Sequence, residues 1–280
     1  MRITVITVCY NAEESIERAI KSVIGQDYED IEYVIIDGAS TDHTIEIISR
    51  YERQISVFVS EPDAGIYDAM NKGIERATGD FVYFLGADDW LIDSHVVSNV
   101  VEFIQSNLGY SLYMGGVILY HDKLRLIKKS NFNLTAEDIK HGHMCPHQGL
   151  FSKRSLFIKE FDTRYKIAAD YEFVLRNVVQ GTPFCMMQIY VAYYSLFGVS
   201  ESQEIYNEYE SIIRRYLGER YLNRIEALQK KVRRPDVVKS LIKRILINIL
   251  GERRFFSLLS WNDFDTVKEE KNGINYYSDV

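Results

Sequence analysis

The segment that most constrains this chain runs from Phe81 to Trp90, where a hydrophobic run ends in two adjacent carboxylates. Four of the five residues before Gly86 are aromatic or β-branched, which is typical of a buried strand. Asp88 and Asp89 follow that strand, at the edge where open α/β sheets bind ligands. Carboxylates at such an edge suit a divalent cation, and a cation suits a diphosphate. A plain turn with a helix cap fits the same residues, because Asp is common in both.

Strands and helices are expected to alternate along the N-terminal part of the chain. The sequence predicts strands at 3–8, 33–36, 55–60 and 81–85, and helices at 11–24, 41–53 and 65–77. Asn11 is the expected N-cap of the first helix, and Ser40 or Thr41 that of the second. Alternation at this spacing indicates an α/β fold with a parallel sheet and right-handed crossovers.

The rest of the chain reads as a mixed region followed by a helical one. Helices are expected at 96–105, 135–139 and 171–179, a hairpin at 111–121 with 124–128, and strands within 184–197. Further helices are expected at 205–217, 221–232 and 236–250. We therefore predict a domain over residues 1–202 and a helical, basic extension over 203–280.

Charge is distributed unevenly along this chain. The net charge is −7, yet residues 211–256 carry thirteen Arg or Lys and four Asp or Glu, about +9, which leaves about −16 elsewhere. Such a split predicts a basic segment that meets an anionic membrane surface. A solvated helical face that packs on the domain is the alternative. Charge alone would also permit nucleic-acid binding, but no recognition motif supports it.

Cysteine usage and hydropathy indicate the compartment. Cys9, Cys145 and Cys185 are widely spaced and form no CxxC pair, which suggests a reducing environment. No apolar stretch is long enough for a transmembrane helix, and the N-terminus lacks the pattern of a signal peptide. A cytoplasmic protein is therefore expected.

Polar clusters follow the first and second strands. Thr7, Cys9, Tyr10 and Asn11 occupy the exit of the first strand and the start of the next helix, a natural binding edge. The cluster has neither GxGxxG nor GxxxxGK[ST], so neither a dinucleotide fold nor a P-loop kinase is indicated. Asp37, after the second strand, could accept a hydrogen bond from a ring N–H or a ribose hydroxyl, whereas Asp42 reads mainly as support for a helix.

A third polar cluster follows the third strand. A turn and a C-cap glycine would explain Gly73 and, in part, Asp63. That interpretation leaves the remaining polar side chains of the helix without a role. These candidates for ligand binding are Gly65, Tyr67, Asp68 and Asn71.

These segments, in this order, resemble the inverting family 2 glycosyltransferases with the GT-A fold. The resemblance extends from Val5 to about Ser202, and it is strongest to bacterial enzymes that build O-antigen and related surface polysaccharides. The segments that carry it are Tyr10-Asn11, 37–42, 61–73, Gly79-Asp80, 85–89, His147-Gln148-Gly149, 168–171 and 197–200. It implies a mixed, mostly parallel central sheet flanked by helices, with donor binding in residues 1–93 and acceptor binding in 94–202.

The resemblance also implies residue roles. Asp37 would contact the nucleotide base, and Asp63 with the residues after it would line the donor pocket. Asp88, flanked by Ala87 and Asp89, matches the last acid of the DxD motif and would bind Mn²⁺ or Mg²⁺ on the diphosphate. Gly86 stands where that motif often begins with Asp. Asp170 matches the general base that deprotonates the acceptor hydroxyl.

The implied reaction moves a hexose from a nucleotide-diphosphate sugar, a UDP-sugar above all, to a lipid-linked saccharide. It would take place at the inner face of the plasma membrane, with inversion at the anomeric carbon. Alternatives are a nucleotidyltransferase, which would release pyrophosphate, and a non-catalytic protein that only binds nucleotide sugars.

His147, Gln148 and Tyr171 are candidates for the acceptor side. Cys145 and His147 could also suggest a Cys–His nucleophile. On an extended segment their side chains would point the same way, but no third orienting group is near in sequence. Contact with the sugar or acceptor is therefore the favoured role of His147, with a buried, satisfied histidine as the alternative.

Overall fold

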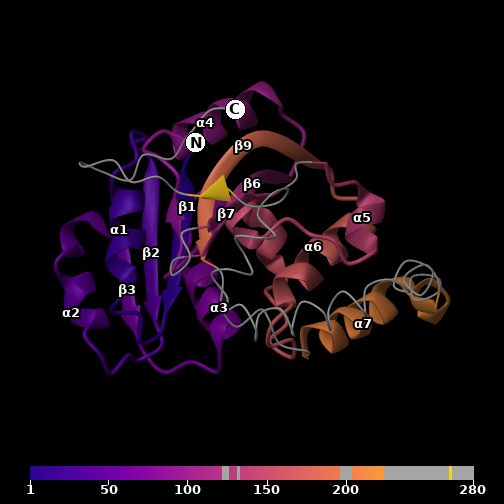
Figure 1. Ribbon diagram of the computed structural model, residues 1–280, viewed down its shortest axis with the longest axis horizontal. Coiled ribbons are helices and arrows are strands. Elements are labelled where there is room, and N and C mark those ends of the chain that lie inside the picture. The colour runs from indigo at the N-terminus through magenta and orange to yellow at the C-terminus, as the bar shows by residue number, and fades with distance from the viewer. Residues whose placement is uncertain (122–125, 131–132, 196–203, 224–264, 267–280) are drawn as a thin grey trace.

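The structure, a computed structural model, describes residues 1–121, 126–130, 133–195, 204–223 and 265–266. A curved mixed sheet runs through this part of the chain, and helices flank it (Figure 1). The expected α/β fold with a mixed sheet between helices is therefore confirmed.

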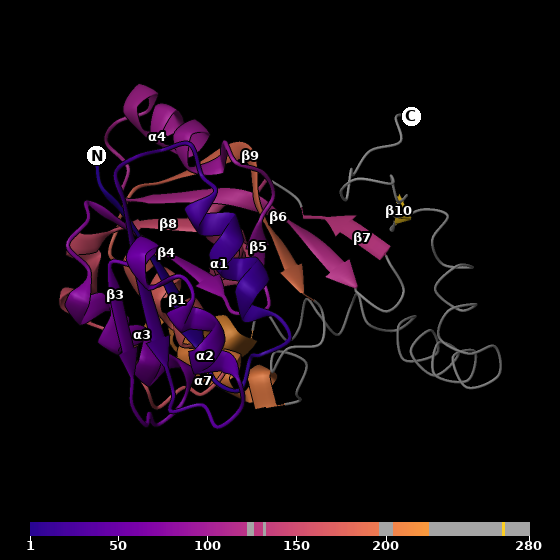
Figure 2. The same cartoon turned by 90° about the vertical axis from the view of Figure 1, so that its left-hand side faces the viewer.

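All described strands belong to one sheet. They are β1 (Ile3–Cys9), β2 (Ile31–Asp37), β3 (Val57–Ser60), β4 (Phe81–Gly86), β5 (Trp90–Leu91), β6 (Leu112–His121), β7 (Leu126–Lys129), β8 (Leu150–Lys153), β9 (Phe184–Ser195) and β10 (Asp265–Thr266). The strand order is β10-β7-β6-β8-β4-β1-β2-β3, while β9 pairs with β5 and β6. Strands β1 to β4 pair in parallel, whereas β8 joins β4 and β6 antiparallel. Figure 2 shows β7 and β10 at the end of the sheet away from β3.

The helices form a layer on each face of the sheet. They are α1 (Ile16–Ile24), α2 (Thr44–Ser49), α3 (Ile66–Arg76), α4 (Val96–Ser106), α5 (Ala136–Lys140), α6 (Ala169–Val179) and α7 (Glu204–Leu217), with 3-10 turns η1 (Glu52–Gln54), η2 (His147–Gly149) and η3 (Arg154–Ile158). Buried residues of α1, α2 and α4 form one hydrophobic core, and those of α3, α5, α6 and α7 form the other. The sheet therefore has no apolar face left to water over its central strands.

Strand β1 occupies the point where the strand order reverses. Every residue of β1 is buried, as expected for a strand covered by helices on both faces. Its neighbours are β2, reached through α1, and β4, reached through α3 from the opposite core. Ligands of open α/β sheets bind at the carboxyl ends of strands beside such a reversal. The ends of β1, β2 and β4 therefore define the edge where a site is expected.

Two predicted helix starts were wrong. Asn11 has a left-handed backbone, with φ of 48°, and α1 begins only at Ile16. The Asn11 side chain accepts a hydrogen bond from the Thr41 amide instead, at 2.9 Å. Helix α2 begins at Thr44, and the carboxylate that accepts its first amide belongs to Asp42, at 3.0 Å. A contact between the exits of β1 and β2 thus occupies Asn11, whereas the start of α2 is capped locally by Asp42.

Gly73 is not the predicted C-cap, because it lies inside α3. A Cβ atom at Gly73 would come within 2.6 Å of the Ile6 side chain. The glycine therefore serves the close approach of α3 to β1, which brings the start of α3 to the carboxyl edge of the sheet.

The first helix of the C-terminal extension packs on the domain. The predicted helix 205–217 is confirmed as α7, and its Ile212 and Ile213 are buried in the core that contains α6. Of the helix predicted at 221–232, only the first three residues are described, and they are helical. The helix predicted at 236–250 and most of the basic segment lie outside the described residues. Among the described residues, no helix is both long and apolar enough to cross a membrane.

Candidate active site

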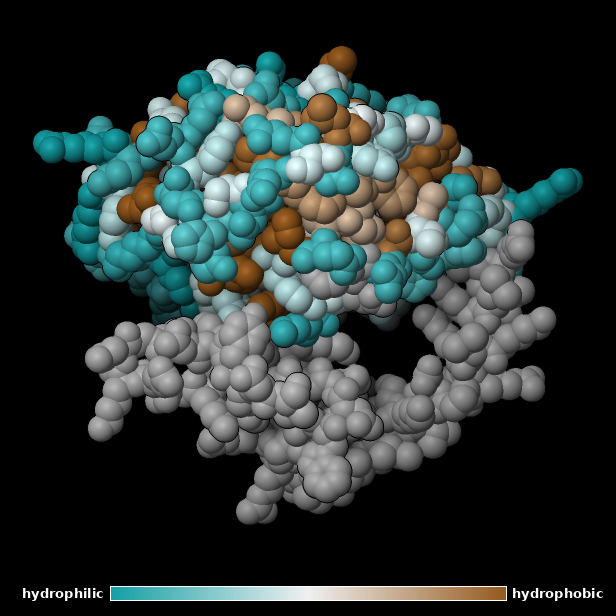
Figure 3. Space-filling view, turned by 90° about the horizontal axis from the view of Figure 1, so that it is seen from above, coloured by the Kyte–Doolittle hydropathy of each residue, from teal (hydrophilic) through white to brown (hydrophobic). Residues whose placement is uncertain are grey.

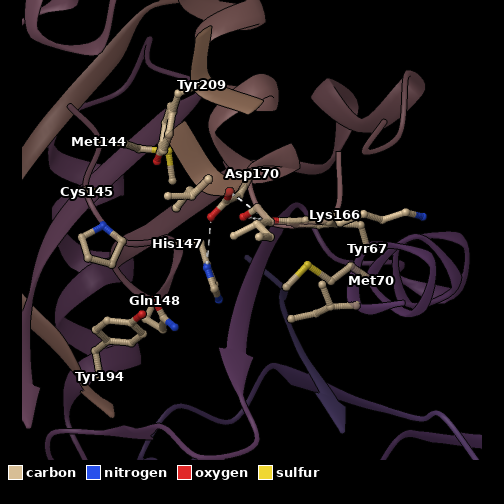
Figure 4. A pocket seen from close by; sticks show the side chains of 14 residues that line it. Tyr67, Met70, Met144, Cys145, His147, Gln148, Lys166, Asp170, Tyr194 and Tyr209 are labelled. Atoms are coloured by element: carbon tan, nitrogen blue, oxygen red, sulfur yellow. Dashed lines mark hydrogen bonds and ion pairs between the residues drawn. The ribbon is translucent and has the colours of Figure 1, made fainter. Parts of the chain in front are cut away.

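A cavity of about 210 Å³ opens beside the start of α6. Most of the described side chains around it are apolar or aromatic, and the polar ones are His147, Gln148, Lys166 and Asp170. Figure 4 shows Asp170 at the centre, with His147 on one side and Tyr67 of α3 on the other. The apolar and aromatic lining residues are Ile66, Tyr67, Met70, Met144, Cys145, Pro146, Ile167, Tyr194, Ile205 and Tyr209.

Asp170 lies in the first turn of α6, and its side chain is 18% exposed to solvent. Its Oδ1 accepts a hydrogen bond from the Tyr171 amide at 2.8 Å and lies 3.0 Å from the Tyr67 hydroxyl. That hydroxyl is also 2.7 Å from the Ile167 carbonyl, so α3 fixes both the carboxylate and the loop before it. Within the described part of the chain, the contact of Oδ2 is the looser one with His147, at 3.3 Å. One oxygen is thus fixed while the other retains capacity for a ligand proton.

His147 lies between two acidic groups. Burial disfavours its imidazolium form, but a hydrogen bond to Asp170 and the charges of Asp170, Asp89 and Asp88 outweigh burial, so the pKa of His147 is raised. The position follows from the sheet, because η2 precedes β8, which runs antiparallel to β4 and brings His147 beside the end of β4. The histidine thereby connects Asp170 to the acids that follow β4.

Asp89 is buried and Asp88 is exposed. The Asp89 carboxylate accepts hydrogen bonds from the Gln148 amide at 2.7 Å and from the Ser195 backbone N–H at 2.8 Å. Burial, and then the charge of Asp88, raises the pKa of Asp89 to about 7. Gln148 Oε1 is buried and has no hydrogen-bond partner among the residues that the structure describes. Asp89 therefore links η2 to the end of β9 beneath the site, whereas Asp88 is exposed to solvent.

The end of β4 offers oxygen ligands to a divalent cation. Among the described residues, no cluster of three or more His, Cys, Asp and Glu could hold a metal ion. A site completed by substrate is still compatible with these residues, since Mg²⁺ usually binds through one or two carboxylates, water and substrate phosphates. Both carboxylates converge above Gly86, where a Cβ would lie 2.5 Å from Asp89 and 3.1 Å from Asp88. A cation held by Asp88 would offset their mutual repulsion.

Arg18 of α1 supports the turn that carries Asp88. Its guanidinium lies 3.6 Å from the centre of the Trp90 ring and donates a hydrogen bond to the Asp88 carbonyl at 3.1 Å. Trp90 is in turn stacked on Tyr193, with ring centres 4.9 Å apart. The cation–π contact and the stacking fix the backbone from which the Asp88 carboxylate projects.

Several predicted binding residues are buried and already bonded within the protein. Asp37 is fully buried, and its carboxylate accepts hydrogen bonds from Ser40 and Ser60. Asn71 ties α3 to the backbone of Phe161 at 2.9 and 3.0 Å. The other buried members of the predicted set are Thr7, Cys9 and Tyr171, whose hydroxyls or thiol contact Tyr33, Asp37 and Ile139 respectively. These side chains therefore make contacts within the protein that hold the strands, helices and loops around the site in place.

Other predicted residues lie at the open carboxyl edge. Tyr10 is 64% exposed, and Asn11 is exposed beside it. Asp63 accepts a hydrogen bond from the Gly65 amide at 2.8 Å, and its other oxygen lies 2.5 Å from where a Gly38 Cβ would be. The remaining two are Asp68, which caps the Ala64 amide at 3.0 Å, and the half-buried Ala87.

Cys145 is buried behind His147, and burial, together with the charge of Asp170, raises the pKa of its thiol to about 12. A thiol with that pKa stays protonated at neutral pH, whereas a nucleophilic cysteine must ionise. The structure thus disfavours the Cys–His nucleophile for a different reason than the sequence does, because Asp170 does contact His147 but the thiol stays protonated.

The profile of Glycosyl transferase family 2 matches residues 4–166, more than half of the chain. The chain belongs to glycosyl transferase family 2. This family 2 glycosyltransferase is 32% identical over 203 residues to a PGL/p-HBAD biosynthesis glycosyltransferase of Mycobacterium bovis, which covers 70% of the chain and 77% of the relative. It is also 35% identical over 185 residues to an uncharacterized glycosyltransferase of Mycobacterium tuberculosis, with 65% and 70% of the two chains covered.

Solved structures share the fold of this family 2 glycosyltransferase. Residues 1–349 of Staphylococcus aureus TarS in complex with UDP-GlcNAc align with a TM-score of 0.62 at 19% identity, over 76% of this chain and 65% of that one. A Pyrobaculum calidifontis mannosyltransferase in complex with GDP-Man and Mn²⁺ aligns with a TM-score of 0.54 at 20% identity, over 77% and 61% of the chains. At these identities the likeness supports the GT-A fold, and it confirms the predicted fold class.

The family profile of this glycosyltransferase ends before Asp170 and α7, and some site residues there escaped sequence reasoning. Lys166, the last residue that the profile matches, and Ile167 precede α6, and Ile205 and Tyr209 lie on α7, outside the segments that carry the resemblance. Tyr194 enters from β9. A hydrophobic helix face gives no local sign that two of its members line a cavity, so only the packing of α7 on α6 could identify them.

Proposed function

We propose that this family 2 glycosyltransferase moves a hexose from a nucleotide-diphosphate sugar to the hydroxyl of a lipid-linked saccharide, with inversion. The observation that carries the proposal is the placement of His147, in contact with Asp170 and within the field of Asp88 and Asp89. Acids far apart in the sequence thus serve one continuous site, with a donor side at the end of β4 and an acceptor side in the cavity.

Asp170 would act as the general base for the acceptor. The acceptor hydroxyl would occupy the cavity and give its proton to Oδ2, while Tyr67 and the Tyr171 amide hold Oδ1 in place. His147 would orient Oδ2. One base is sufficient for a single displacement, in which the hydroxyl attacks the anomeric carbon opposite the leaving diphosphate. Inversion of configuration follows from that geometry.

The donor side would use Asp88 with Tyr10 after β1 and Asp63 after β3. Asp88 would hold Mn²⁺ or Mg²⁺, which offsets the charge of the leaving diphosphate when bound. Tyr10 and Asp63 would meet the nucleotide base. The contribution of Asp37 would be indirect, since its buried carboxylate holds the loop that begins at Gly38. TarS has been crystallised with UDP-GlcNAc and with UDP, which favours a UDP-sugar donor here.

The acceptor is proposed to be lipid-linked and part of a bacterial surface polysaccharide such as an O-antigen. The basic segment 211–256 would then hold the enzyme at the inner face of the plasma membrane. Figure 3 shows one face of the described residues, on which hydrophilic side chains predominate and smaller hydrophobic patches lie among them. Sedimentation with phosphatidylglycerol vesicles, but not with phosphatidylcholine vesicles, would support this location.

A panel of nucleotide sugars tests the proposed function. Purified protein with Mn²⁺ is incubated with each donor and lipid-linked acceptors, and the products are identified by mass spectrometry. Release of nucleoside diphosphate with a glycosylated acceptor supports the proposal. Release of pyrophosphate would identify a nucleotidyltransferase, and donor binding without any turnover would identify a binding protein.

Replacement of the exposed acid at the end of β4 should weaken metal-dependent nucleotide binding. In Asp88→Ala, we expect the affinity for UDP with Mn²⁺ to fall by at least about 10–100-fold, since even outer-shell changes at metal sites cost that much. Calorimetry measures the effect, and EDTA should bring wild type to the same weak affinity. The control is Asp30→Asn, whose partly exposed carboxylate pairs with Arg2 at the opposite edge of the sheet. Equal UDP affinities of Asp88→Ala and wild type with Mn²⁺ would exclude Asp88 as the ligand.

A further inference from the structure

Helix α7 reaches across to the loop that presents Asp170. The Glu208 carboxylate accepts hydrogen bonds from three consecutive backbone N–H groups, those of Lys166 at 2.6 Å, Ile167 at 2.9 Å and Ala168 at 2.8 Å. Bonds of this kind, from a carboxylate to backbone amides, are roughly twice as strong as neutral ones. Helix α6 starts at the next residue, and its N-cap residue Ala168 provides no side-chain cap. Glu208 therefore caps the start of α6 from another helix, because Ala168 has no side chain that could accept these hydrogen bonds.

The loop 166–168 is held from two sides. Glu208 binds its N–H groups from α7, and the Tyr67 hydroxyl, on α3, binds the Ile167 carbonyl at 2.7 Å. The same Tyr67 hydroxyl lies 3.0 Å from Asp170 Oδ1. A shift of this loop would therefore move the carboxylate relative to His147 and to the cavity. Figure 1 shows α7 alongside α6, on the side of the molecule away from α1.

Helix α7 also forms part of the cavity wall. Ile205 and Tyr209 line the cavity, and the Tyr209 ring lies 4.3 Å from that of Tyr171, the neighbour of Asp170. Glu208 stands between these two wall residues in sequence. The wall and the loop contact thus come from a single turn of α7.

We propose that Glu208 is a positioning residue for Asp170, and that α7 completes the acceptor side of the active site. This inference rests on the proposed function, because it assigns Glu208 to the geometry of the proposed base. A displacement of a catalytic group by about 1 Å can lower the rate about 100-fold, so loss of the loop contact should reduce turnover without any change at the donor side.

The variants Glu208→Gln and Glu208→Ala test the inference. Glutamine places an NH₂ group against backbone donors, and alanine removes the contact entirely. The matched control is Glu210→Gln, which changes an exposed carboxylate on the same helix. Each full-length variant is compared with wild type in hydrogen exchange at the amides of 166–168, in UDP binding with Mn²⁺, and in kcat and KM for a donor and acceptor that wild type uses.

We expect faster exchange at 166–168 in both Glu208 variants, and a kcat lower by about 10–100-fold. The number of UDP sites per chain, the UDP affinity and the KM for the donor should stay at wild-type values. A merely destabilised protein would instead lose UDP sites in proportion to activity. Glu210→Gln should resemble wild type in every measurement.

Either unchanged exchange at 166–168, or faster exchange with a wild-type kcat, would overturn the positioning role. A loss of UDP sites that matches the loss of kcat would overturn it as well. A wild-type chain that binds UDP and transfers no sugar would overturn the proposed function itself, and the variants cannot produce that result.

Discussion

Asp170→Asn is expected to lower the rate of sugar transfer by about 10²–10⁴-fold, the usual contribution of a general base. Asparagine preserves the size of the side chain and its contact with the Tyr67 hydroxyl, but it cannot take up the acceptor proton. Because Asp170 lies on the cavity side of His147, the donor side should be unaffected. Single-turnover transfer assays and calorimetry with UDP and Mn²⁺ measure the two effects separately.

The control for this variant is again Asp30→Asn, which removes a partly exposed carboxylate and its ion pair with Arg2 at the amino edge of the sheet. It should leave both transfer and UDP binding at wild-type levels. Asp170→Asn with near-normal turnover would show that another group accepts the proton. His147 would then be the first residue to examine, because it is the one imidazole that contacts Asp170 in the described part of the chain.

Arg176→Ala is expected to destabilise the fold by about 3–5 kcal/mol, because it leaves a buried carboxylate unpaired. Arg176 lies 3.0 Å from Glu172 on α6, where their side chains are 5% and 0% exposed. The arginine also donates a hydrogen bond to the Lys159 carbonyl at 2.8 Å, and Tyr216 of α7 bonds the same glutamate. Urea unfolding followed by circular dichroism gives the change in free energy.

An exposed ion pair between α7 and the residues just after it provides the comparison for Arg176. Arg214 and Glu219 lie 2.6 Å apart with more than half of each side chain in water, so Arg214→Ala should cost only about 0–1 kcal/mol. The double variant Glu172→Gln with Arg176→Ala should be less destabilised than Arg176→Ala alone, because no buried charge remains unpaired. A cost for Arg176→Ala no larger than that for Arg214→Ala would contradict the expected role of the buried pair.

The buried pair Glu172–Arg176 and the Glu208 contact show that α7 is packed as part of the domain that contains the candidate active site. Tyr216 reaches Glu172, Arg215 pairs with Asp162 at 2.9 Å, and Glu208 binds the loop before α6. The boundary predicted at 202–203 remains a prediction for the chain as a whole. For α7, however, the contacts indicate that a truncation there would remove part of the acceptor wall as well as a surface helix.

Periodicity and residue type were sufficient to predict the first four strands, because runs such as Ile3–Cys9 and Phe81–Gly86 are hydrophobic on both faces. The same reasoning placed Asp88 at a carboxyl edge, since that position depends only on where a strand ends. It failed at Asn11 and at the predicted cap Ser40 or Thr41, because these residues bond to one another across the exits of β1 and β2. It also missed the short strands β5 and β8, whose pairing depends on distant partners.

The sequence by itself determined the α/β architecture, the acids after β4 and the candidate base, because hydrophobic periodicity and recognisable short motifs are local properties of the chain. Only the tertiary structure decided which of those groups meet. Asn71 with Phe161, Gln148 with Asp89, and Glu208 with the loop 166–168 are separated by 90, 59 and about 40 residues. Contacts between residues so far apart in sequence follow from the packing of helices on a sheet. In that packing, burial and hydrogen bonding are satisfied across the whole domain.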